Sequence, residues 1–129
     1  MPEAIRAPGL MEPIGPYADA VRTGNLLFLS GCVPVDAEGR TVGGDDVRSQ
    51  ARQVFSNIGE VLVAAGVGFQ DIVKLTVYVT DVADRVHLND IRHELFGDWK
   101  PASTLVEVSA LAVAAWKVEV EAIVELPGA

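Results

Sequence analysis

Two β-type segments near the C-terminus constrain the fold more than any other feature of this sequence. Residues 101–108 carry one acidic residue, Glu107, and residues 118–124 carry two, Glu119 and Glu121, at alternate positions, which is typical of strands with two different faces. One parity carries most of the polar groups and comprises Ser103, Leu105, Glu107, Glu119 and Glu121. The other parity is nearly all apolar and comprises Thr104, Val106, Val108, Val118, Val120, Ala122 and Val124. We therefore expect one face to pack in a core and the other to place carboxylates against water, a ligand or another subunit.

The composition indicates one soluble domain. A chain of 129 residues with 50% hydrophobic residues is long enough to bury its own core. Cys32 is the only cysteine, which excludes an intrachain disulfide and a zinc site of several thiolates and favours a reducing compartment. No segment approaches the roughly 20 continuous apolar residues of a membrane helix, and the N-terminus lacks a signal-peptide pattern. We expect a soluble, cytoplasmic protein with no membrane partner.

The charge disfavours one class of partner. The formal net charge is -8, and the 10 Lys and Arg residues are spread along the chain. Nucleic-acid binding requires clustered cations that neutralise phosphates, so we expect no nucleic-acid partner. The simplest interpretation of the acidity is that it keeps the protein soluble.

Hydrophobic periodicity predicts the elements along the chain. Residues 1–16 are rich in proline and read as a surface arm, and residues 17–22 and 26–30 read as a hairpin. Asp45 and Asp46 precede a helical pattern that Gly66 ends. Residues 72–79 alternate strictly, as a half-buried strand does. A second helix begins after Asp81 or Asp84, buries Leu88, Ile91 and Leu95, and ends near Gly97.

These elements predict one α+β domain over residues 1–129, with the order β-β-α-β-α-β-β and a mixed sheet. Two helices cover only one face of such a sheet. The opposite face combines Tyr78, Thr76 and Leu105 with several carboxylates, which is too apolar for a purely solvated surface. We therefore expect it to form a subunit interface, where ligand sites commonly lie.

Four segments together resemble the RidA family, also called YjgF or reactive-intermediate deaminases. They are Ile14 to Tyr17, Gly24 to Gly31, Asp71 to Lys74 and Val118 to Ile123, in the order and spacing of that family. The resemblance spans about residues 14–124. It implies a chorismate-mutase-like fold, a homotrimer with clefts between subunits, and hydrolysis of enamines and imines without a cofactor. Some members of the family have been described as endoribonucleases.

The resemblance also implies roles for individual residues. Glu119 matches the family glutamate that positions or deprotonates the attacking water, while Tyr17, Ser30, Gly31 and Asn89 would line the cleft. In the family, an arginine after the Pro-Ala pair binds the substrate carboxylate through its fork of donors.

Here that arginine position holds Ser103, which carries no charge. Hydrogen bonds to charged groups contribute roughly 1.5 to 3 kcal/mol, so about a hundredfold weaker binding of a 2-imino acid is expected. We therefore predict a substrate that is neutral or bears its charge elsewhere.

Other residues allow two interpretations each. Cys32 is either a nucleophile near the cleft or a small buried hydrophobe, and Trp116 is either an aromatic wall for a ligand or a packing residue. Glu107 is a further candidate beside Ser103. Arg92 and Lys100 either supply the missing cation or are solvated surface charges. The sequence predicts no metal site, because His87 and His93 lie on different helix faces.

Three functions are compatible with these residues. The first is an imine or enamine hydrolase of the Rid type that needs no cofactor and acts on a small-molecule substrate. The second is a regulatory or binding module that keeps the cleft without deamination. The third is a pathway-specific enzyme that uses the cleft for condensation, cyclisation or another hydrolysis.

Overall fold

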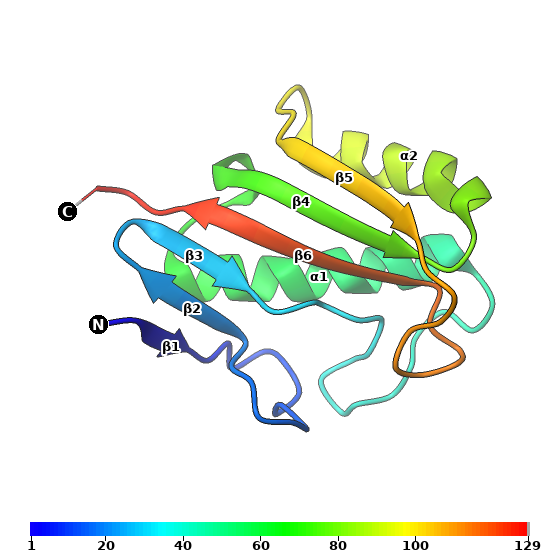
Figure 1. Ribbon diagram of the computed structural model, residues 1–129, viewed down its shortest axis with the longest axis horizontal. Helices are drawn as coiled ribbons and strands as arrows, with labels where there is room; N and C mark the ends of the chain where they lie inside the picture. Colours follow the sequence, from blue (N-terminus) through cyan, green and yellow to red (C-terminus); the bar gives the residue numbers. More distant parts are fainter. Residues whose placement is uncertain (129) are drawn as a thin grey trace.

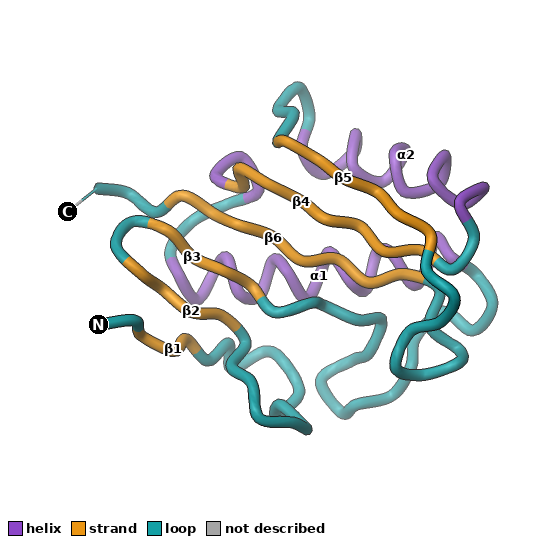
Figure 2. Tube along the Cα trace, in the orientation of Figure 1, coloured by secondary structure: helices purple, strands orange, loops and turns teal. Residues whose placement is uncertain are grey.

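The computed structural model describes residues 1–128 and contains one six-stranded sheet with two long helices on one of its faces (Figure 1). The strands are β1 (Glu3–Ile5), β2 (Ala20–Thr23), β3 (Leu26–Leu29), β4 (Ile72–Val79), β5 (Ala102–Glu107) and β6 (Val118–Glu125). The helices are α1 (Val47–Ala65) and α2 (Arg85–Phe96), and short 3-10 turns, Phe69–Asp71 and Val82–Asp84, precede β4 and α2. Long loops gather at one end of the sheet (Figure 2).

The sheet is mixed, as predicted. Its spatial order is β1-β2-β3-β6-β4-β5, in which β4 and β5 are parallel and all other pairs are antiparallel. The hairpin, the strand over 72–79 and the last two strands of the chain are all present, but the first strand of the hairpin begins at Ala20 and not at residue 17. The predicted α+β fold is confirmed.

The N-terminal arm contains a strand that the sequence did not predict. Glu3–Ile5 pairs with β2 and extends the sheet by one edge strand. Beyond it, Ala7 is fully buried, and the backbone N–H of Ala7 and the guanidinium of Arg6 both donate to the carboxylate of Asp19. Three residues are too few to show a strand periodicity, so only pairing with β2 reveals them as a strand.

Helix α1 forms where its caps and its apolar stripe agree. The side chain of Asp46 accepts from the backbone N–H of Arg48 at the start, and Gly66 ends the helix with a φ of 75°, which glycine adopts without strain. The buried face includes Val54, Phe55, Ile58, Val61 and Leu62. This face packs against the sheet and forms the centre of the core.

Helix α2 covers the β4–β5 side of the same sheet face (Figure 1). Leu88 and Ile91 are buried as expected, but the third buried position is Phe96 and not Leu95, which is 38% exposed. The prediction for Leu95 was wrong because the ring of Phe96 packs edge-on against Phe55 and Phe69, and this contact sets the rotation of the last turn.

The side chains of strand β5 point to the opposite faces of the sheet from those that the sequence predicted. Its register places Ser103 beside Leu75 and Leu105 beside Val77, both on the helix-covered face. The Thr104 and Val106 side chains therefore point to the open face, where the sequence placed Ser103, Leu105 and Glu107. The prediction failed because β5 is an edge strand with no fully buried residue, so apolarity does not mark its inner face.

The helix-covered face and the open face differ sharply in exposure. Every second residue of β6, and of β4 from Leu75 onward, is buried under the helices. A bulge between Ile72 and Lys74 leaves Val73 exposed. The open face combines the polar side chains of Thr76, Tyr78, Glu119 and Glu121 with the apolar Val106 and Phe28, which are 38% and 41% exposed. Exposed apolar side chains among ordered polar ones are typical of an interaction surface.

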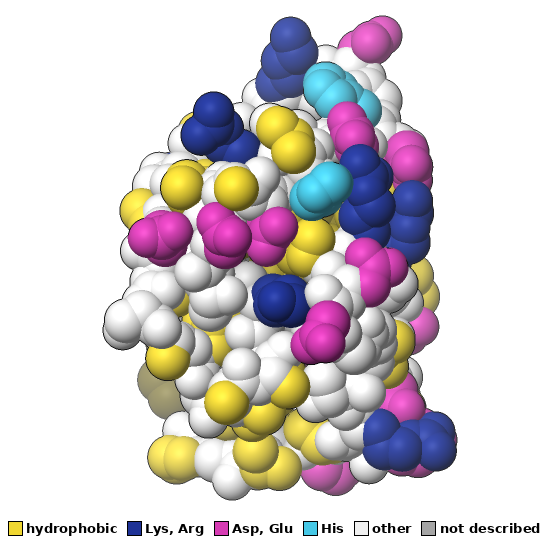
Figure 3. Space-filling model, turned by 90° about the vertical axis from the view of Figure 1, so that its right-hand side faces the viewer, with side chains coloured by type: hydrophobic (Ala, Val, Ile, Leu, Met, Phe, Trp, Pro, Cys, Tyr) yellow, Lys and Arg dark blue, Asp and Glu magenta, His cyan; other side chains and the backbone are white. Residues whose placement is uncertain are grey.

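The outer surfaces of the two helices are joined by ion pairs. Arg48 contacts Asp90 at 2.7 Å and Arg52 contacts Glu94 at 2.6 Å, each from α1 to α2. Acidic and basic side chains lie near the histidines on the side seen in Figure 3. Within residues 1–128, neither helix has the length and apolar composition required to cross a bilayer.

Candidate functional site

A hollow of about 380 Å³ opens at the loop-rich end of the sheet, beside the start of β6. Five of the residues singled out in the sequence line it, namely Tyr17, Ser30, Gly31, Trp116 and Glu119. They come from four separate segments of the chain, so only the fold brings them together. The other lining residues are Ile14, Gly15, Val33 and Ala112, none of which the sequence analysis proposed as a site residue, although Ile14 and Gly15 lie in a segment that carries the family resemblance.

Glu119 is the only ionisable carboxylate among the described residues that line this hollow. It is partly buried, and its carboxylate lies against the backbone of Gly31, where a β-carbon would overlap its Oε2 atom. Burial first, and the nearby charge of Glu121 second, raise the pKa of Glu119 above that of an ordinary glutamate. A carboxylate with a raised pKa is a stronger base once it is ionised.

The backbone under Glu119 is held in place on both sides. Cys32 and Val120 exchange two backbone hydrogen bonds, at 2.8 and 3.1 Å, in an isolated bridge. The N–H of Ser30 donates to the carbonyl of Asp19, and the hydroxyl of Ser30 donates to the carbonyl of Ala18 at 2.6 Å. The Ser30 oxygen is therefore left to accept a hydrogen bond from a ligand.

Two aromatic side chains form walls of the hollow. Tyr17 is 50% exposed, which leaves its ring accessible to a ligand. Trp116 is only 8% exposed, and its indole N–H donates to the hydroxyl of Thr41 at 3.1 Å. Trp116 therefore both packs in the structure and walls the hollow, so its two interpretations are compatible.

The neighbouring carboxylate, Glu121, is engaged elsewhere. The hydroxyl of Tyr78 donates to it across the β4–β6 pair on the open face. Glu121 raises the pKa of Tyr78 through this hydrogen bond, and it also acts on Glu119 through its charge. It therefore adjusts the base without lining the hollow.

Cys32 does not line the Glu119 hollow but a smaller one beside it, of about 60 Å³. Burial, followed by the charges of Asp19 and Glu119, raises the pKa of the Cys32 thiol to about 12. The reactive form of cysteine is the thiolate, which is scarce at neutral pH with such a pKa. The structure thus favours the interpretation of Cys32 as a small buried hydrophobe.

Glu107 has a local structural contact. Its carboxylate accepts from the backbone N–H of Val82 at 2.9 Å, where the 3-10 turn before α2 begins. It lies outside the Glu119 hollow. This hydrogen bond supports the turn that leads into α2.

Asn89 and Ser103 lie apart from the other five predicted residues. Asn89 lines a second hollow of about 260 Å³, formed by the C-terminal half of α2 and the connection to β5. The hydroxyl of Ser103 accepts from the guanidinium of Arg92, which lines that same hollow, at 3.0 Å. Ser103 and Glu119 point to opposite faces of the sheet, so one subunit does not bring them together.

Comparison with known proteins identifies the family. The family model described as Endoribonuclease L-PSP matches residues 7–126. The chain belongs to this family, which is that of the Rid proteins. A solved Rid family protein of unknown function from Yersinia pestis is 34% identical, has a TM-score of 0.92, and is matched over 98% of this chain and 100% of its own.

Two curated Rid relatives differ in what their names say. A RutC family protein of Pyrococcus horikoshii is 41% identical over 111 residues, which cover 86% of this chain and 88% of the relative. A 2-iminobutanoate/2-iminopropanoate deaminase of Dermatophagoides farinae is 34% identical over 120 residues, covering 93% of each. Rid relatives of this chain thus include a named deaminase, which supports a general deaminase-like role.

No group of three or more His, Cys, Asp or Glu side chains among residues 1–128 is arranged to hold a metal ion. The groups that line the Glu119 hollow include a carboxylate, a serine oxygen and two aromatic rings.

Proposed function

We propose that this protein is a cofactor-independent Rid-type hydrolase that converts a small imine or enamine into a carbonyl compound and ammonia. The observation that carries the proposal is the partly buried Glu119 carboxylate, which has a raised pKa and faces a hollow walled by Tyr17 and Trp116. A carboxylate so placed can take a proton from water while excluding bulk solvent from one side.

The proposed reaction uses one water molecule. Glu119 accepts a proton from water as the water oxygen bonds to the C=N carbon, and the π electrons move to nitrogen, which takes that proton back from Glu119. The resulting carbinolamine loses its C–N bond and its hydroxyl proton, which releases ammonia and the carbonyl product. An enamine enters the same sequence after it tautomerises to the imine.

The proposal includes the choice of substrate. Ser103 stands where the family resemblance implies a carboxylate-binding arginine, and serine supplies one donor and no charge. We therefore propose that compact 2-imino acids are poor substrates and that the preferred one is neutral or bears its charge elsewhere. The proposed setting is a homotrimer in the cytoplasm, with clefts formed between subunits.

The test is ammonia release from a panel of imines generated in situ by amine and amino-acid oxidases. We expect Glu119→Gln to lower kcat by about 100- to 1,000-fold, the usual contribution of a positioned base. Glu125→Gln is the matched control, since Glu125 is exposed on the same strand and has the same parity. We expect this control to retain full activity.

The opposite result would favour the binding module. If no imine in the panel reacts faster with the protein than without it, and a small molecule still binds in the Glu119 hollow, deamination is excluded as the function. If 2-iminopropanoate were instead the fastest-reacting imine in the panel, this result would contradict only the proposed choice of substrate.

A further inference from the structure

The hollow formed by the C-terminal half of α2 and the connection to β5 is basic in an acidic protein. Arg92, His93 and Lys100 line it together with the amide of Asn89, and no Asp or Glu is among its described lining residues. The whole chain has a net charge of -8, so the charge of this hollow is opposite in sign to that of the chain. A concave surface lined by one sign of charge attracts ligands of the other sign.

The acidic residues closest to Arg92 along α2 are already paired. Asp90 contacts Arg48 at 2.7 Å and Glu94 contacts Arg52 at 2.6 Å, both toward α1. Arg92 itself has no carboxylate within ion-pair distance among residues 1–128 and donates through Nη1 to the neutral hydroxyl of Ser103. Its guanidinium therefore keeps donors for an anion.

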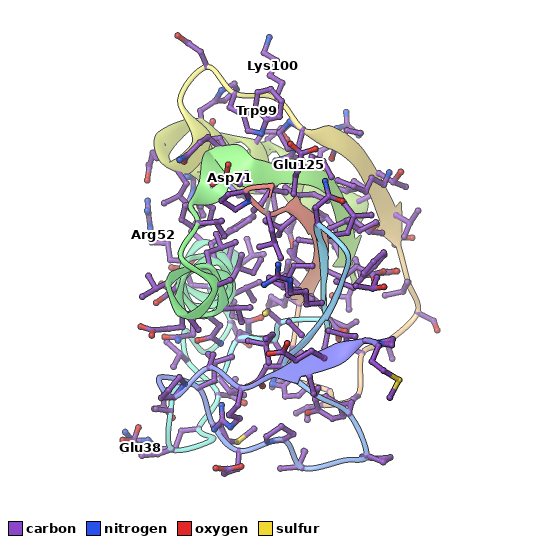
Figure 4. The ribbon with its side chains drawn as sticks, turned by 90° about the vertical axis from the view of Figure 1, so that its left-hand side faces the viewer. Glu38, Arg52, Asp71, Trp99, Lys100 and Glu125 are labelled. Atoms are coloured by element: carbon purple, nitrogen blue, oxygen red, sulfur yellow. The ribbon has the colours of Figure 1, made fainter. Side chains whose placement is uncertain are left out.

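Arg92 is also held in place. It is partly buried, and burial lowers the pKa of its guanidinium, which remains protonated at any physiological pH. The adjoining connection is fixed because the indole N–H of Trp99 donates to the carbonyl of Ile72 at 2.8 Å. Trp99 and Lys100 project together at one end of the molecule (Figure 4). A positioned guanidinium loses less entropy when it binds an anion than a mobile one does.

We propose that Arg92, assisted by Lys100 and Asn89, forms the subsite that binds an acidic group of the substrate. This inference rests on the proposed function and narrows its substrate class. The preferred substrate is then an imine that carries an acidic group at a distance from the C=N carbon. The Arg92 hollow and the Glu119 hollow share no residue. A second copy of the chain must therefore bring its Arg92 hollow to the Glu119 hollow of the first.

The test uses two imines that differ only in the remote charge, those of 5-aminopentanoate and of pentylamine, each generated by an amine oxidase. We expect the wild-type protein to prefer the anionic imine. Arg92→Ala lowers kcat/KM for the anionic imine by about 10- to 100-fold and leaves the neutral imine unchanged. Arg92→Lys, which keeps the charge without the fork, has an intermediate effect.

Arg85→Ala is the matched control, because Arg85 is an exposed arginine at the start of the same helix. It should leave both substrates unchanged. Equal activity of Arg92→Ala and wild type on the anionic imine would overturn the inference, provided that both proteins have the same melting temperature. A loss on both imines would show that Arg92 supports the structure and would also overturn it.

Binding separates this inference from the proposed function. Titration calorimetry with pentanoate, which undergoes no reaction, should show binding that Arg92→Ala weakens at least tenfold and Arg85→Ala does not. If the wild type hydrolyses neither imine while pentanoate binding depends on Arg92, the proposed function fails and the anion subsite stands. If the wild type does not bind pentanoate, or binds it without need of Arg92, the anion subsite fails.

Discussion

The carboxylate of Glu119 occupies space beside Gly31 that a β-carbon would fill. Gly31 has an ordinary backbone conformation, since its φ is not positive. The absence of a side chain is therefore required by the close approach of Glu119 and not by backbone strain. At the scale of single residues, Gly31 is what allows a charged group to sit at the wall of the hollow.

Gly31→Ala should displace the Glu119 carboxylate with little effect on the local backbone. We expect kcat to fall at least tenfold, and the free energy of unfolding to fall by about 1–3 kcal/mol because the site becomes overpacked. Gly59→Ala is the control, because the β-carbon that it adds would lie 3.7 Å from the nearest atom of the Phe69 ring, which is an ordinary contact. In the interior of α1 this change should stabilise the protein by about 0.5–1 kcal/mol without altering kcat. Full activity of Gly31→Ala would contradict the assigned position of Glu119.

The raised pKa of Glu119 predicts a pH dependence. The base acts as the carboxylate, so kcat/KM should fall as the pH drops through a midpoint above the value of about 4.3 for an ordinary glutamate. Glu121→Gln removes the second cause of the shift and should move the midpoint to lower pH. Burial, the larger cause, persists, so the midpoint stays above the ordinary value. A midpoint that is unchanged or higher in Glu121→Gln, measured with a substrate that does not titrate in this range, would contradict this coupling.

At the scale of elements, the sequence predicted those strands whose two faces differ in burial. In β6, and in β4 from Leu75 onward, every second residue is buried, so alternation in the sequence marks the inner face correctly there. It fails at Val73, which the alternation placed inside and which a bulge between Ile72 and Lys74 leaves exposed. Strand β5 lies at the sheet edge, with both parities largely exposed, and β1 has only three residues. The direction in which β5 side chains point depends on pairing with β4, and the existence of β1 depends on pairing with β2. Neither pairing can be recognised from the residues of the strand itself.

The same distinction applies to the candidate site. Glu119 could be predicted because β6 has a clear periodicity and a family resemblance, whereas Arg92 was open to interpretation as a solvated surface charge. No local pattern distinguishes Arg92 from Arg85 on the same helix. The difference arises from Ser103, which lies 11 residues later and meets Arg92 only after β5 pairs with β4.

One buried side chain joins helix α1 to the loop that carries Trp116, a residue that lines the Glu119 hollow. The amide of Gln50, fully buried on α1, donates to the carbonyls of Gly44 and Ala115 and accepts from the N–H of Lys117. These bonds fix the loop that carries Trp116 into β6. Gln50 thus links helix α1 to the wall of the hollow.

Gln50→Leu should leave these three backbone groups without a partner. We expect the free energy of unfolding, measured by urea denaturation, to fall by about 3 kcal/mol, because each buried unsatisfied group costs about 1–3 kcal/mol and the loops recover some bonds to water. Gln53→Ala is the control. Gln53 is partly exposed and makes one side-chain hydrogen bond, to Asn57, so its loss should cost less than about 1 kcal/mol. Equal stability of Gln50→Leu and wild type would rule out this link.

At the scale of the whole molecule, the chain carries two separate hollows, which in the proposed homotrimer would each be part of a shared site. The Glu119 hollow opens at the loop-rich end of the sheet, and the Arg92 hollow is formed by the C-terminal half of α2 and the connection to β5. The open face also exposes apolar side chains such as Phe28 and Val106. Association of identical chains would cover this face and bring unlike hollows together, because a closed ring repeats one heterologous contact.

This arrangement predicts complementation between two variants that each have lowered activity on the anionic imine. Glu119→Gln subunits retain Arg92, and Arg92→Ala subunits retain Glu119, so a mixed ring contains some interfaces with both residues intact. In randomly mixed trimers, about one quarter of the interfaces combine one intact residue from each parent. We therefore expect the mixture, unfolded together and refolded, to regain up to about one quarter of the wild-type turnover of the anionic imine.

The control is the same two variants refolded separately and then combined without exchange, which should remain at the sum of their residual activities. Native mass spectrometry establishes whether mixed trimers have formed, since the two substitutions change the subunit mass by different amounts. Mixed trimers with no recovered activity would place Glu119 and Arg92 in separate sites. Recovered activity requires that each acts from a different subunit on the same substrate, because within one subunit they lie in hollows that share no residue.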